Sequence, residues 1–264
     1  MTMSDMEKCK IYKEIQSSVK SLLDKGTSVD RNVYESQLIS LKTDLAAKNE
    51  NVRKAALEFL NFLLTLYVGD IQSHILKVLL DSSVNRLVQN CVLKSIKKNV
   101  IDAILEDKFD FTEMLLPWKN QNVNKLTNII EEVCLNDLSR EKCKEFFIGK
   151  VITAMMDLST DNEIRNILTD MAFMLSTIVP ISDLSPVELE MFLKDVNTKY
   201  VKNIGDLRDQ NYSNWHNLWI FLVRFCDKNI HHSMELTNKL LRVVEYAFRN
   251  SSIQQRLKGY DCWK

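Results

Sequence analysis

Apolar residues recur at three- and four-residue steps along most of this chain. Residues 49–64 show the pattern clearly, with apolar side chains at Val52, Ala55, Ala56, Phe59, Leu60 and Leu63. Such steps place the apolar side chains on one face of an α-helix. One helix cannot bury that face by itself, so the pattern predicts similar helices packed alongside.

The same periodicity predicts further helices joined by short polar segments. We expect helices over residues 5–23, 30–45, 71–80, 82–93, 101–116 with a break near residues 109–111, 122–135 and 139–158, and one after Ile164 that Pro180 ends. Thr160–Glu163 and Ser185–Glu188 each read as a capping box. In that motif a Ser or Thr side chain and the Glu three residues later bind free amides at a helix start.

One aliphatic position near the start of every second helix defines a repeat. The equivalent residues are Val52, Val84, Val123, Ile164 and, with weaker matches, Leu207 and Ile253, which lie 32 to 46 residues apart. These intervals overlap the roughly 40–47 residues of HEAT and armadillo repeats. The sequence therefore predicts an all-α fold, a HEAT/armadillo-like α-solenoid of antiparallel helix pairs, as a single continuous array over residues 1–264. The alternative is an irregular helical bundle.

The composition favours helices and a reduced intracellular environment. Only 5 Gly and 3 Pro occur among 264 residues, which argues against a sheet with many tight turns. The six cysteines are scattered and form no Cys-x-x-Cys motif, so we expect reduced, buried thiols in a cytosolic or nuclear protein. No secretory signal begins the chain, and the apolar window 57–68 is shorter than the roughly 20 residues of a membrane span.

No pattern of catalytic or metal-binding residues is visible. None of the four histidines stands at a metal-ligand spacing from another histidine, a cysteine or a carboxylate, and we expect the pair His231–His232 to form a surface turn. The chain has no Gly-rich phosphate loop and no Gly-x-Ser-x-Gly motif. We therefore expect a protein that is not an enzyme, with no catalytic residue, metal or cofactor.

Basic residues gather in two places although the net charge is zero. The clusters comprise Arg86, Lys94, Lys97 and Lys98, and Lys239, Arg242, Arg249, Arg256 and Lys258. Such clusters suit binding of the DNA backbone or of a phosphopeptide rather than base reading. The alternative for each cluster is an ordinary solvated helix face.

The last fifty residues resemble a known family. They contain Leu218–Phe225 with a Trp at its second position, the pair His231–His232, the segment Asn238–Arg249 with Leu-Leu-x-x-x-Glu-x-x-Phe, and a final Tyr260–Lys264 ending in Trp-Lys. In this order, they resemble the N-terminal helical-repeat region of the telomere-associated Rap-interacting factor (Rif) family. The helix that contains Ala55, Ala56 and Leu57 is similar to an early helix of that family.

The resemblance implies a nuclear, chromatin-associated scaffold that regulates DNA replication timing, telomeres and double-strand-break repair. It implies chromatin and damage-response proteins as partners, and DNA as a ligand of the fungal members. It also implies a protein phosphatase that is bound through other parts of the full-length protein. The zero net charge argues against strong DNA binding. The chain ends inside an expected helix, and for that reason we expect an N-terminal fragment of a larger protein. The alternative is a protein-interaction scaffold that docks a partner peptide in a concave groove without DNA contact.

Overall fold

A computed structural model describes residues 4–25, 40–41, 43–45, 47–65, 98–107, 111–115 and 123–263. Every regular element in these residues is a helix, as the all-α prediction requires. The chain divides into two compact units, Met1–Val133 and Cys134–Lys264, and the division falls inside one helix.

The first unit is built around the contact between helices α1 (Asp5–Asp24) and α3 (Glu50–Thr65). Helix α3 buries Val52 and most of the predicted apolar face, and Phe59 lies against Tyr12 of α1 with 4.9 Å between ring centroids. Further along are α6 (Lys98–Leu105), α7 (Phe111–Leu115) and α8 (Val123–Asn136). The predicted break lies between α6 and α7.

A buried carboxylate joins residues 43–45 to helix α1. Asp44 is 2% exposed and accepts hydrogen bonds from Lys8 Nζ at 2.5 Å and from Tyr12 Oη at 2.8 Å. Burial, then the bond to this carboxylate, raises the pKa of Tyr12. A buried carboxylate needs such partners, because an unpaired charge is costly away from water.

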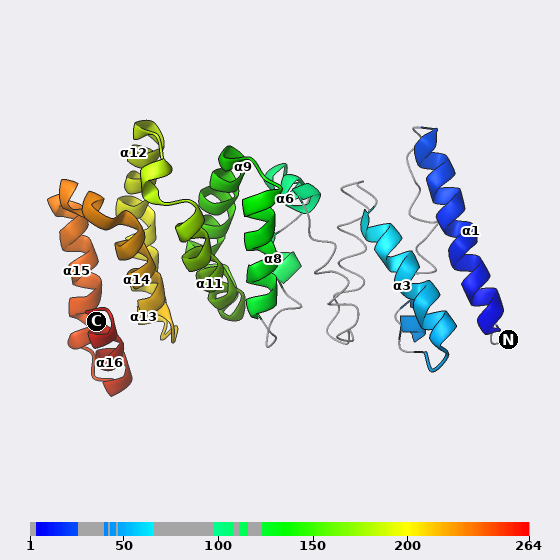
Figure 1. The fold of residues 1–264 in the computed structure, drawn as a ribbon. Coiled ribbons are helices and arrows are strands. Elements are labelled where there is room, and N and C mark those ends of the chain that lie inside the picture. The colour runs from blue at the N-terminus through cyan, green and yellow to red at the C-terminus, as the bar shows by residue number, and fades with distance from the viewer. Residues whose placement is uncertain are drawn as a thin grey trace. The chain divides into compact units, whose positions relative to one another are not determined.

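The second unit consists of helices arranged as consecutive pairs (Figure 1). The first pair joins α9 (Arg140–Glu145), the π-helical turn η3 (Phe146–Ile152) and α10 (Thr153–Met156) to α11 (Asn162–Ile178). After the 3-10 turn η4 (Ile181–Asp183), the second pair joins α12 (Pro186–Asp195), the π-helical turn η5 (Val196–Tyr200) and α13 (Val201–Asp209) to α14 (Trp215–Cys226). The 3-10 segment η6 (Asp227–His232) leads to the last pair, α15 (Met234–Phe248) and α16 (Ile253–Asp261).

Neighbouring pairs contact each other through equivalent helices. Helix α13 contacts α15, while α14 contacts both α11 and α16. Hydrogen bonds also join neighbouring pairs. Asn203 Nδ2 of α13 donates to the Met156 carbonyl of α10 at 2.8 Å, and Trp215 Nε1 of α14 donates to Gln255 Oε1 of α16 at 2.7 Å. The first helix of one pair therefore packs on the first helix of the next pair, and the second helix of one pair packs on the second helix of the next.

An arginine near the start of three second helices makes the same contact with the chain before it. The backbone amides of Arg53, Arg165 and Arg256 each bond to the carbonyl four residues back, at the start of the helix. Their guanidinium groups reach the carbonyls five residues back, at Lys48, Thr160 and Ser251. Arg53 and Arg256 also bind the carbonyl six residues back, and Arg165 binds those of Met155 and Asp157.

Three details of the sequence prediction were wrong. Thr160 does not cap α11, because its hydroxyl donates to the Ala154 carbonyl; Asp161 is the cap and accepts the amides of Glu163 and Ile164. Leu207 lies in α13, a first helix, so it is not equivalent to Ile164.

The third correction concerns the last repeat. Ile253 is 66% exposed, whereas Gln255 is 4% exposed and directly precedes the arginine of α16. Gln255, not Ile253, therefore occupies the position of Val52 and Ile164. A glutamine is tolerated there because it accepts the indole bond of Trp215.

Other predictions were confirmed or lie outside the described residues. Ser139 caps α9, and Ser185 with Glu188 forms the predicted capping box of α12. Helix α11 ends at Ile178, just before Pro180. The helices expected over 71–80 and 82–93 and most of 30–45 lie outside the described residues, and the continuous array over residues 1–264 stays a prediction.

We predict that Arg165→Met destabilises the protein by about 3 kcal/mol, because the carbonyls of Met155 and Thr160 would lose their donor in a buried site. Arg165 is 0% exposed, so water could not replace the guanidinium. Urea unfolding measures the change. Arg242→Met, which alters an exposed arginine, is the control and should change stability by less than about 0.5 kcal/mol.

Candidate interaction surfaces

An open groove of about 740 Å³ lies on the second unit. Its walls come from the C-terminal half of α11, the η4 turn, α12, the C-terminal half of α14 and the start of η6. Its apolar lining includes Phe173, Pro180, Ile181, Leu184 and Leu189. A concave groove was one alternative expected from the sequence, but its position and lining were not.

The floor of the groove is the edge of a phenylalanine cluster. Phe221 and Phe225 of α14 stack with 5.7 Å between ring centroids, and Phe173 of α11 meets Phe221 edge-on at 5.4 Å. Phe147 and Phe192 complete the cluster with edge-on contacts to Phe225 at 5.3 and 5.4 Å. Offset and edge-on pairs add to the stability gained from burial, so this floor is tightly packed.

The rim of the groove carries hydroxyl groups from α11 and charged groups from α14 and η6. Ser176 and Thr177 line it from α11, and both hydroxyls bond to carbonyls of their own helix. Arg224 of α14 and Asp227 and Lys228 of η6 also line it and are exposed. The rim therefore presents two cations and one anion above an apolar floor.

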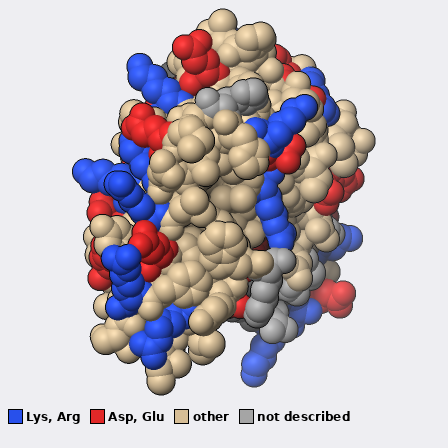
Figure 2. All heavy atoms as spheres, turned by 90° about the vertical axis from the view of Figure 1, so that its left-hand side faces the viewer, with Lys and Arg blue, Asp and Glu red and all other residues tan. Residues whose placement is uncertain are grey.

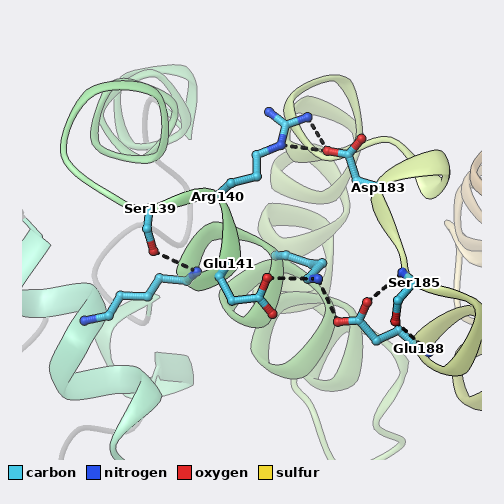
Figure 3. A network of polar contacts seen from close by, with 8 residues as sticks. Ser139, Arg140, Glu141, Asp183, Ser185 and Glu188 are labelled. Carbon is cyan, nitrogen blue, oxygen red and sulfur yellow. Dashed lines mark hydrogen bonds and ion pairs between the residues drawn. The ribbon is translucent and has the colours of Figure 1, made fainter.

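A polar network holds the η4–α12 wall against helix α9 (Figure 3). Arg140 Nε donates to Asp183 Oδ2 at 2.6 Å, and its Nη2 contacts the same oxygen. Lys144 Nζ lies 2.7 Å from Glu188 and 3.1 Å from Glu141. Two carboxylates of η4 and α12 are thus paired with cations of α9.

The same network perturbs the titration of Glu188. The Lys144 ammonium, followed by the Ser185 hydroxyl and amide, lowers the pKa of Glu188 from 4.5 to about 2. Glu188 performs two tasks here, because the Ser185 amide donates to it at 2.7 Å as part of the capping box. The carboxylate therefore fixes both the start of α12 and its contact with α9.

Backbone strain marks the charged side of the groove. Asp227 follows α14 with φ 47° and ψ −136°, a combination rarely adopted by residues other than glycine. The turn redirects the chain from α14 into η6, and it brings Asp227 and Lys228 to the rim. Strain of this kind occurs preferentially at functional sites.

The predicted basic residues near the middle of the chain are largely outside the described structure. Arg86, Lys94 and Lys97 lie outside the described residues, and Lys98 begins α6 with a side chain that is likewise not described. Their role as a phosphate-binding face stays a prediction.

The C-terminal basic residues make several contacts within the protein. Lys239 Nζ lies 2.6 Å from Glu235 and donates to the Asn197 carbonyl, and Arg249 pairs with Glu245 at 2.5 Å. Arg256 binds the loop carbonyls described above, and burial lowers the pKa of Lys258. Arg242 is exposed on α15.

The surface around α15 and α16 is mixed rather than uniformly basic. Figure 2 looks onto this end of the second unit and shows Lys and Arg interspersed with Asp and Glu around a broad area of other residues. Large exposed side chains on these helices and just beyond α16 include Leu241, Tyr246, Leu257, Tyr260 and Trp263. Arg208 lies over the Tyr246 ring at 5.2 Å, which places one cation against this area.

Thiols and histidines form no evident reactive centre in the part of the chain that is described. Cys9, Cys134, Cys143, Cys226 and Cys262 are free, and all but Cys9 are buried. No group of three or more His, Cys, Asp or Glu among the described residues could hold a metal ion. The described helices include none with the length and apolarity to cross a membrane.

Comparison with known proteins gives one partial similarity. The chain is 24% identical over 162 residues to the telomere-associated protein RIF1 of Drosophila melanogaster, a match that covers 58% of this chain and 11% of that protein. No protein-family model matches the chain, and no solved structure matches it. The similarity is weak, and the chain corresponds to a small part of the much longer relative.

We predict that the Glu188–Lys144 pair makes stability fall on acidification. The folded-state pKa of Glu188 is depressed, so its contribution is present above about pH 4.5 and is lost as the pH falls towards about 2. Urea unfolding from pH 6 to pH 2.5 should show a smaller acid-induced loss for Glu188→Gln than for the wild type. Glu190→Gln, an exposed change on α12, should keep the wild-type slope.

Asp227→Gly should raise stability by about 1 kcal/mol, because glycine adopts this backbone conformation without steric strain. Thermal melting measures the gain. Asp227→Ala removes the carboxylate but keeps the strain, so it should not raise the melting temperature; an equal gain from both variants would contradict a strained backbone.

Proposed function

We propose that this chain is a non-enzymatic helical-repeat scaffold of a Rif-like, chromatin-associated nuclear protein. The observation that carries the proposal is the partial similarity to telomere-associated protein RIF1 of Drosophila melanogaster. The proposed protein acts in DNA replication timing, telomere maintenance and double-strand-break repair. Chromatin and damage-response proteins are its proposed partners, and a phosphatase is bound by other parts of the longer protein.

The repeated arginine contact supports a HEAT-like array as the form of this scaffold. Arg53 lies in the first unit, and Arg165 and Arg256 lie in the second, yet all three bind the carbonyl five residues back. Stacking of equivalent helices within the second unit supports the same architecture. Repeat arrays of this type present extended binding surfaces, which suits a scaffold.

Two binding modes fit the scaffold. The first is contact with DNA phosphates through the basic residues, of which Arg242 is exposed on α15. The second is docking of a partner protein, which the groove beside α14 favours because it combines an apolar floor with a charged rim. The ion pairs of Lys239 and Arg249 weaken the first mode, since phosphates would have to displace carboxylates.

Fluorescence anisotropy with labelled duplex and forked DNA tests the phosphate contact. We expect affinity that falls steeply between low and near-physiological salt, because binding releases counterions. Arg242→Glu combined with Lys258→Glu should weaken binding at least tenfold at low salt.

The charge-matched control is Lys10→Glu combined with Lys54→Glu, at exposed positions of α1 and α3. This control should bind DNA as the wild type does. If the wild type fails to bind DNA even at low salt, the phosphate contact is ruled out for this chain and protein docking remains as the binding mode.

A further inference from the structure

We infer that the groove between α11, η4, α12 and α14 binds a short peptide segment of a partner protein. The peptide places one large apolar side chain on the phenylalanine floor and an adjacent Asp or Glu against Arg224 and Lys228. This inference rests on the proposed scaffold function and names the chemistry of one partner.

The apolar part of the site is preformed. Phe173, Ile181 and Leu189 are only half-buried where they line the groove, whereas Phe221 and Phe225 beneath them are buried. A volume of about 740 Å³ lies within the range typical of binding sites for small ligands and side-chain anchors. Rigid walls reduce the entropy lost on binding, so a single anchor can bind without prior rearrangement.

The charges favour an acidic peptide over a basic one. Asp183 of η4 and Glu188 of α12, which are not among the residues that line the groove, are paired with Arg140 and Lys144. The groove lining includes two exposed cations, Arg224 and Lys228, with Asp227 between them in sequence. An incoming carboxylate therefore meets net positive charge, and a guanidinium can bind it through two parallel hydrogen bonds.

The same features disfavour a nucleic-acid strand in this groove. Backbone binding needs a row of cations that tracks successive phosphates. The groove rim has two cations and an anion, and much of its remaining lining is aliphatic or aromatic. A peptide with alternating apolar and acidic groups matches this lining better.

A selection experiment on the whole chain tests the inference. Random 12-residue peptides displayed on phage are selected against the full chain, and enriched sequences are synthesised with a fluorescent label for polarisation titrations. We expect enriched peptides to share a Leu, Ile, Phe or Trp within two positions of an Asp or Glu.

Two variants remove the site in different ways. Thr177→Trp fills the groove from an exposed position on α11, and Arg224→Glu combined with Lys228→Glu reverses the rim charge. Each should weaken peptide binding at least tenfold. The matched control is Thr198→Trp, at an exposed threonine on η5 whose hydroxyl also bonds to its own helix, and it should leave affinity unchanged.

A variant that gains affinity shows that the losses of peptide binding do not result from misfolding. Asp227→Asn removes the anion from the rim and should strengthen binding of acidic peptides about threefold. A misfolded protein would not show this gain. Circular dichroism melts of every variant establish that the helices are retained.

Several results would overturn the inference. The inference is wrong if no peptide is selected, or if the enriched peptides lack acidic residues. It is also wrong if Thr177→Trp binds the peptide as tightly as the wild type, or if reversing the rim charges leaves peptide affinity unchanged. Displacement of the peptide by a DNA oligonucleotide would assign the groove to nucleic acid instead.

The outcome is separable from that of the DNA experiment. Thr177→Trp should retain the DNA affinity of the wild type, and Arg242→Glu with Lys258→Glu should retain peptide affinity. A wild-type chain that binds DNA but selects no peptide rejects the groove alone, and a wild-type chain that binds peptide but no DNA rejects the phosphate contact alone.

Discussion

The contact between an arginine near a helix start and the carbonyls of the preceding turn is the interaction on which this structure depends most. The last carbonyls of a helix have no partner within that helix. Between paired helices the chain turns sharply, which removes water from some of these groups. Arg165 solves this problem by donating to three carbonyls at 2.7 Å, and the Tyr212 ring covers its guanidinium at 5.5 Å. A buried charge is tolerated there because hydrogen bonds replace its hydration.

This contact has consequences for the rest of the second unit. A fixed turn sets the position of α11 relative to α9 and α10, and α11 then supplies Phe173 to the aromatic cluster. Phe221 and Phe225 of α14 belong to the same cluster, which fixes α14 against α11. The ion pairs of Arg140 and Lys144 hold η4 and α12 against α9. The groove exists because these walls are held apart while their floor is tightly packed. The groove therefore follows from local capping chemistry and aromatic packing.

The distribution of charge bears on how such a scaffold would recognise partners. The chain has equal numbers of acidic and basic residues, and several C-terminal cations are used within the protein. The phosphate-binding role predicted for these residues from the sequence stays a prediction. A chain without net charge but with local charged rims is better suited to selecting a particular peptide than to binding any polyanion, because specificity arises from complementary charges at fixed positions.

The sequence by itself determined the helical class, the helices α1 and α3 with the apolar face of α3, the caps at Ser139 and Ser185, and the equivalent aliphatic positions Val52 and Ile164. These features depend on residues close together in the chain, where helical periodicity and capping rules apply directly. Tertiary structure decided that Gln255 replaces an aliphatic residue in the last repeat, because its indole partner Trp215 lies forty residues away. It also decided which cations are paired and where the groove opens. Such features depend on how separate helices meet, and no local pattern in the chain encodes that meeting.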